Sequence, residues 1–179
     1  VEGRWRNGHH LFGLCCCMGR ECLHEAADAI QADDLDEACR AVDRASLYLA
    51  ASSAAMVYTT DFPAQHYRNQ IRAAMPPGFS GSHNSDFNHF KQLKGKLQVV
   101  AMKRWGKSTD QWPAPLLAAF SHFRDTDLLD LDQHILIAAA NIGFGLSLKQ
   151  THERQADASA IGALRRMAEV RKKDFHLPE

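Results

Sequence analysis

The chain has 179 residues, and its 21 lysines and arginines balance its 21 aspartates and glutamates, so the formal net charge is zero. Zero net charge gives no electrostatic signature of nucleic-acid or anionic-membrane binding, and the longest nearly uncharged apolar stretch, residues 135–148, is too short to span a bilayer. A chain of this length can bury a substantial core, so we expect one domain over residues 1–179 that binds neither nucleic acid nor membrane. The basic residues near the C-terminus, Arg165, Arg166 and Arg171 to Lys173, are typical of a solvated helix end.

Cysteine usage indicates the compartment. Three of the five cysteines, Cys15 to Cys17, are contiguous, and adjacent cysteines on a helix point in different directions and rarely pair. We therefore expect reduced thiols and a cytoplasmic protein. The sequence starts at Val1 rather than Met, so we expect that it was trimmed, and a targeting segment could have preceded it. No Cys-x-x-Cys motif occurs, so structural zinc and standard c-type haem attachment are not indicated.

Helical periodicity runs along the chain, and no segment alternates with a period of two. The fold class predicted is all-α, a bundle of about seven helices. The first helix is expected over about residues 9–30, and the second is capped by Asp33 or Asp34. The third has Pro63 in its first turn and ends at Pro76, and the fourth runs from about Ser85 to Trp105, where Gly106 stops it. The fifth, sixth and seventh are expected over residues 116–123, about 128–142 and about 156–172.

A glycine- and serine-rich segment, residues 75–87, separates the third and fourth helices. Such segments expose backbone N–H groups and hydroxyls, and this one runs into the positive end of a helix dipole near Ser85. These donors suit a carboxylate, a phosphate or a haem propionate. A plain helix–helix connection with an ordinary serine cap explains the same residues equally well.

His134 lies in a strongly apolar helical stretch. A lone histidine there is more often a core residue than a metal ligand, and the small residues 138–140 suit either a flat macrocycle or a close helix neighbour. If His134 binds haem iron through one ring nitrogen, the other nitrogen needs a hydrogen-bond acceptor. Asp130, one helical turn earlier, is a candidate acceptor.

Three motifs occur in a fixed order along the chain. They are His10-Leu11-Phe12, then Asp61-Phe62 with Tyr67-Arg68 before the loop 79–87, and finally His134 with Ile142-Gly143 eight and nine residues later. This order resembles the tryptophan 2,3-dioxygenase superfamily of histidine-ligated haem-dependent aromatic oxygenases, over roughly residues 9–35, 57–90 and 126–148. The resemblance implies a haem pocket inside the bundle, with haem b as the cofactor and His134 as its proximal ligand.

The same resemblance implies a substrate site. Phe12 and Phe62 would line it, Arg68 or, one turn later, Arg72 would bind a carboxylate, and His83 would donate a proton near bound oxygen, while polar groups would be held by Ser80, Gly81 and Ser82. Each residue also has a structural interpretation, as a core aromatic, an exposed helical arginine or a hydrogen-bonding loop residue.

Departures from the family pattern refine the expected activity. Cys16 stands where the dioxygenases have a distal histidine, although another register brings His9 and His10 closer, and the closing Gly-Thr-Gly-Gly loop is missing. Cys15 to Cys17 are packing residues in one interpretation and a source of a thiolate haem ligand in another. We predict a diverged oxygenase of secondary metabolism, in which dioxygen or peroxide adds oxygen to an aromatic amino acid or indole derivative. The departures favour monooxygenation or a peroxygenase-like reaction, and dioxygenative ring cleavage is the competing reaction. A homodimer or homotetramer is expected. The alternative is a non-catalytic helical module, either a haem sensor or carrier or a partner-binding bundle.

Overall fold

The structure, a computed structural model, describes residues 2–75, 84–141 and 160–173. Every regular element in these ranges is helical, and no strand occurs in them. The all-α prediction is therefore confirmed. The elements are α1 (Glu2–Gln31), α2 (Leu35–Thr60), α3 (Ala64–His66), the π-helical η1 (Tyr67–Ile71), α4 (Arg72–Ala74), α5 (Ser85–Trp105), the 3-10 turn η3 (Thr109–Gln111), α6 (Ala114–Asn141) and α7 (Ala160–Arg171).

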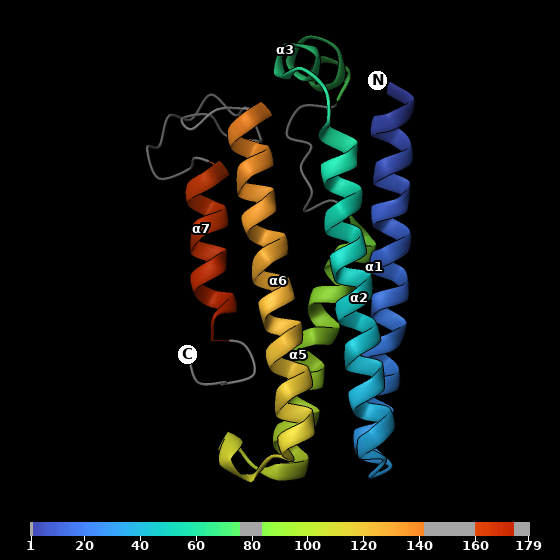
Figure 1. Ribbon diagram of the computed structural model, residues 1–179, viewed down its shortest axis with the longest axis vertical. Helices are drawn as coiled ribbons and strands as arrows, with labels where there is room; N and C mark the ends of the chain where they lie inside the picture. Colours follow the sequence, from blue (N-terminus) through green and yellow to red (C-terminus); the bar gives the residue numbers. More distant parts are fainter. Residues whose placement is uncertain (1, 76–83, 142–159, 174–179) are drawn as a thin grey trace.

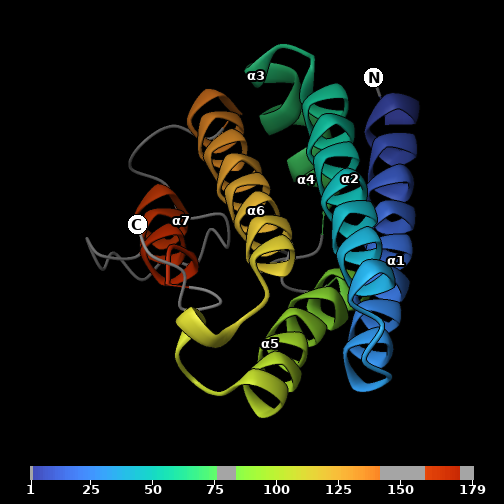
Figure 2. The same cartoon turned by 60° about the horizontal axis from the view of Figure 1, so that its bottom comes forward.

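The long helices form a bundle around one main core. Helices α1 and α2 run antiparallel side by side, α6 packs along α2, and α7 lies against α6 on the side away from α1 (Figure 1). Helix α5 packs against α1 and is inclined to the other long helices (Figure 2). The core between α1, α2, α5 and α6 contains the almost inaccessible side chains Leu23, Leu97, Leu116, Phe120 and Phe123.

Local signals set most helix ends where they were expected. The side chain of Asp34 accepts a hydrogen bond from the Glu37 N–H at 3.0 Å and caps α2. Helix α5 begins at Ser85 as predicted, but its cap is Asn84, whose side chain accepts a hydrogen bond from the Phe87 N–H at 2.9 Å. Gly106, with φ of 92°, ends α5 in a conformation that side chains disfavour.

Two predicted boundaries were wrong. The expected fifth and sixth helices are one continuous helix, α6, since no glycine or proline interrupts residues 116–141. The apolar periodicity weakens near residue 127 because two aspartates, Asp127 and Asp130, occupy buried positions there. Helix α1 also begins earlier than expected, at Glu2. The described residues thus hold six helices, with α3, η1 and α4 counted as one and the single-turn η3 left out. In these segments, no helix combines the length and apolar character needed to cross a bilayer.

Glycines let α1 approach its neighbours closely. A Cβ atom added at Gly8 would clash with the Thr59 side chain on α2 and lie 3.1 Å from the Thr59 Cα. At Gly19 the added atom would lie 2.9 Å from the Phe90 ring on α5. By contrast, Gly13 on the same helix has open space around it. Gly8 and Gly19 therefore fix how near α1 lies to α2 and α5.

We predict opposite effects of alanine at two glycines of α1. Gly8→Ala should lower the free energy of unfolding by about 1–3 kcal/mol, because α1 and α2 must separate to accept the methyl group. Gly13→Ala should raise it by about 0.5–1 kcal/mol, because alanine loses less backbone entropy in a helix. Urea denaturation followed by circular dichroism measures both. A Gly8→Ala protein as stable as the Gly13→Ala protein would contradict the close packing.

Candidate functional site

Phe12, Cys16, Phe87, Asp130 and His134 gather where α1, α5 and α6 meet, and we refer to them as the Phe12–His134 site. The Phe12 ring lies edge-on to the His134 ring, with 6.5 Å between their centroids. The centroid of the Phe87 ring lies 5.7 Å from that of the Phe12 ring. Phe12 and Cys16 are buried in a small apolar cluster that Phe87 packs against. The structure thus brings together Phe12 and His134, which stand 122 residues apart in the sequence.

The hydrogen bonding of His134 fixes its tautomer. Its Nδ1 lies 2.9 Å from the main-chain oxygen of Asp130, one turn earlier on α6. A carbonyl oxygen only accepts, so Nδ1 carries the proton and a neutral ring keeps its lone pair on Nε2. Among the residues that the structure describes, none forms a hydrogen bond with Nε2. The side chain is 25% exposed. This arrangement fits a histidine that offers Nε2 to a metal ion.

The Asp130 carboxyl group is the least satisfied polar group near His134. Its side chain is 3% exposed, and Oδ1 has no hydrogen-bond partner in the described residues. Oδ1 lies 3.5 Å from His134 Nδ1. Burial raises the pKa of Asp130, and the neighbouring His134 opposes that rise. The acceptor of Nδ1 is thus the main-chain oxygen of Asp130, and the buried carboxyl group of the same residue lies beside that contact without a hydrogen bond to the ring.

A buried ion triad lies one turn before Asp130. Asp127 Oδ2 is 2.7 Å from Lys94 Nζ of α5, and Asp127 Oδ1 is 2.7 Å from Arg171 Nη1 of α7. Arg171 also donates to the main-chain oxygen of Asp127 at 3.2 Å. Arg171 was predicted to be a solvated helix end; that was wrong, because its guanidinium is buried against Asp127. The triad joins α5, α6 and α7 beside the site.

Cys16 is poorly suited to act as a thiolate. Burial, followed by the nearby charge of Asp130, raises the pKa of the Cys16 thiol to about 12. The group therefore stays protonated at neutral pH. Of the two ligand types considered from the sequence, this environment favours the imidazole of His134 over this cysteine.

The candidate carboxylate-binding residues lie on the short segment between α2 and α5. The Phe62 ring stacks on Tyr67 with centroids 6.4 Å apart. Arg68 is exposed and donates to the main-chain oxygen of Asn141, the last residue of α6, at 3.4 Å. Arg72 is buried and its Nη1 lies 3.5 Å from Met75 Sδ. Residues 67–71 form a π-helix, an uncommon form often found at functional sites, which the sequence pattern did not reveal.

The remaining predicted residues, Ser80, Gly81, Ser82 and His83, lie outside the described residues, as do Ile142 and Gly143. Sequence reasoning also missed Lys91, Lys94 and Asp127, and it included Phe87 in the loop motif without giving it a role. For Asp127 a signal existed, since residues 127, 130, 131 and 134 share one face of a helix at spacings of three and four. For the lysines no such signal existed, because α5 carries many charges and only packing distinguishes a buried one.

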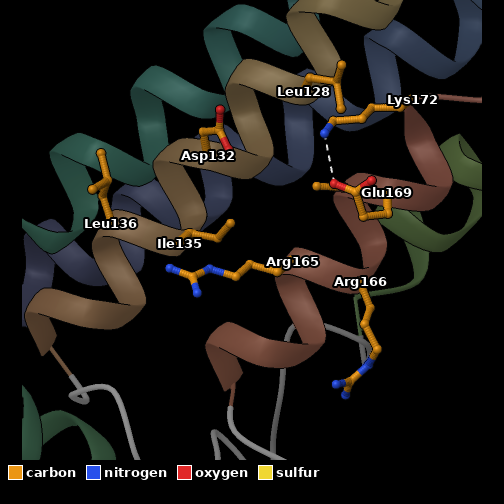
Figure 3. Close-up of a pocket in the computed structure, with 9 residues that line it drawn as sticks. Leu128, Asp132, Ile135, Leu136, Arg165, Arg166, Glu169 and Lys172 are labelled. Atoms are coloured by element: carbon orange, nitrogen blue, oxygen red, sulfur yellow. Dashed lines mark hydrogen bonds and ion pairs between the residues drawn. The ribbon is translucent and has the colours of Figure 1, made fainter.

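A separate groove lies between α6 and α7 (Figure 3), with a volume of about 640 Å³. Leu128, Ile135 and Leu136 form its apolar part, and Glu169 and Lys172 pair at its edge at 2.8 Å. None of the residues predicted for the functional site lines it. The groove and the Phe12–His134 site are therefore distinct features of α6.

We predict that the triad stabilises the fold strongly. Asp127→Asn leaves Lys94 and Arg171 facing a neutral amide in a buried position, so the free energy of unfolding should fall by about 3–5 kcal/mol. Asp125→Asn is the matched control, because its carboxylate is mostly exposed beside Arg124, and it should change stability by less than about 0.5 kcal/mol. Chemical denaturation of both proteins measures the difference. Equal stabilities would mean that the triad contributes nothing.

A family model described as SfmD 3-methyl-L-tyrosine peroxygenase matches residues 2–114 of the chain, more than half of its length. The matched region runs from α1 through α5 and η3 to the first residue of α6. It includes Phe12, Phe62, Arg68 and Phe87, whereas His134 and α7 follow it. No curated protein and no solved structure gives a significant match.

Proposed function

The chain belongs to the SfmD 3-methyl-L-tyrosine peroxygenase family, and from this premise we propose that it is a haem-dependent peroxygenase that inserts one oxygen atom into the ring of an aromatic amino acid. The family name refers to a methylated tyrosine, which supports a tyrosine-like substrate and a role in secondary metabolism. Peroxide is the oxidant that the name implies. Monooxygenation agrees with the missing closing loop and with Cys16 at the usual distal-histidine position.

The observation that carries the haem assignment is the state of His134. With Nδ1–H bonded to the Asp130 main chain, Nε2 is the nitrogen left to hold the iron. The buried carboxyl group of Asp130, with Oδ1 3.5 Å from Nδ1, would make the imidazole a stronger donor whenever it is ionised. When bound, the haem supplies the oxidation.

The chain's own residues position the substrate and exclude water. Phe87 is partly exposed and packs against the buried Phe12, so it offers an apolar surface against which an aromatic ring can pack. Phe62, stacked on Tyr67, lines the segment that carries Arg68. The Arg68 guanidinium is accessible to solvent yet reaches the end of α6, so it can bind a substrate carboxylate with two parallel hydrogen bonds.

Titration of the purified protein with haem tests the cofactor. The wild-type protein should develop a Soret band that saturates at one haem per chain, and His134→Ala should lose that band, with partial recovery on adding imidazole. His122→Ala is the matched control, because His122 is exposed on the same helix, and it should bind haem normally. A wild-type protein without a Soret band, or a His134→Ala spectrum like the wild type, would refute the assignment. A haem protein that adds no oxygen to L-tyrosine or 3-methyl-L-tyrosine with peroxide, as judged by product mass, would favour a sensor or carrier.

Substitution of the two arginines tests the carboxylate contact. Arg68→Ala should weaken binding of an aromatic amino acid by roughly 30- to 1000-fold, because a desolvated carboxylate loses its partner, worth about 2–4 kcal/mol. Arg68→Lys should recover only part of this, since an ammonium cannot make the two-pronged contact. Haem content should stay unchanged in both proteins. If instead Arg72→Ala alone abolishes binding while remaining folded, the contact belongs to the buried arginine one turn later.

A further inference from the structure

Lys91 of α5 is a cation without an anion. Its side chain is partly buried, and its Nζ lies 4.7 Å from the centroid of the Phe87 ring, one turn earlier on the same helix. Within residues 2–75, 84–141 and 160–173, no carboxylate and no other acceptor pairs with this ammonium. The face of the Phe87 ring stabilises the ammonium charge less than full hydration would.

The charges around Lys91 are of the same sign. Burial lowers the pKa of Lys91, and the positive charges of Arg171 and Lys94 lower it further. Both of those cations contact the Asp127 carboxylate. Among the described residues, the Lys91 ammonium therefore lies near two other cations and forms no ion pair of its own.

Lys91 stands at the edge of the Phe12–His134 site. Phe87, which its ammonium covers, contacts Phe12, and Phe12 contacts His134. A ligand whose ring packs against Phe12 and Phe87 would bring a charged substituent close to Nζ. A partly desolvated lysine without a counterion lowers the stability of the free protein, which is the usual cost of a binding residue.

We propose that Lys91 binds a carboxylate group of the ligand that occupies the Phe12–His134 site. The inference rests on the proposed function, which supplies two ligands with this chemistry, the haem through its propionates and the amino-acid substrate through its α-carboxylate. Lys91 thus gives the site a second cation besides Arg68, on a different helix and on the side of α7.

Binding titrations with esterified ligands test this role and separate the two sources. Wild-type protein is titrated with haem and with haem dimethyl ester, and with L-tyrosine and its methyl ester; the ester should bind roughly 10- to 100-fold more weakly in at least one pair. In Lys91→Met that difference should shrink to about twofold, and Lys91→Arg should restore it in part. The pair that responds identifies the source. Lys96→Met, an exposed lysine on the same helix, should behave as the wild type.

A measurement of stability excludes a structural role. Lys91→Met should unfold at the same or higher urea concentration than the wild type, because an unpaired and partly desolvated charge has been removed. A destabilised Lys91→Met protein, or one that keeps both ester differences, overturns the proposal. If the wild type binds no haem, the proposed function fails. The comparison of L-tyrosine with its methyl ester, titrated into the protein without haem, then still decides the role of Lys91. A protein that binds neither ligand overturns both.

Discussion

The Asp127 carboxylate, held between two cations, is the interaction on which the arrangement of the functional region depends. Lys94 and Arg171 approach its two oxygens at 2.7 Å each, from α5 and α7. Burying charges is tolerated only when geometry pairs them well, and a slip of either helix along α6 would separate a cation from this carboxylate. The triad therefore fixes the register of three helices, and with it the positions of Asp130 and Phe87 beside His134.

Helix α6 places three polar residues of the functional region along one line. Asp127, Asp130 and His134 follow each other at spacings of three and four, so one face of the helix carries the paired carboxylate, the carboxyl group with an unsatisfied oxygen, and the imidazole. Arg171 belongs to α7, which lies after the region matched by the family model. The region that the family match covers thus supplies the aromatic side chains Phe12 and Phe87. The part of the chain that follows it supplies His134 and the charged groups near it.

Sequence reasoning reached the elements whose signals are local. The all-α class, the Asp34 cap, the end of α5 at Gly106 and the pairing of His134 with Asp130 all follow from periodicity, cap chemistry or i, i+4 spacing. Sequence reasoning failed where tertiary contacts bury a charged residue that its local sequence places at the surface. Buried aspartates made one long helix look like two, and Arg171 looked like a surface cation because its partner lies 44 residues earlier in the sequence. Lys91 could not be distinguished from its solvated neighbours on α5, since its isolation from carboxylates is a property of the packed state.

The close packing of α1 connects the stability of the bundle to the shape of the site. Gly8, Phe12 and Cys16 follow at intervals of four, so the residue that contacts Thr59 and the residue that faces His134 lie on the same side of the helix. Gly8 sets the distance between α1 and α2. This distance therefore also determines how close the Phe12 ring lies to His134 on α6. A larger residue at Gly8 would withdraw Phe12 from His134 as well as loosen the core. For this reason the packing of the Phe12 ring beside His134 depends on Gly8 as well as on Phe12 itself.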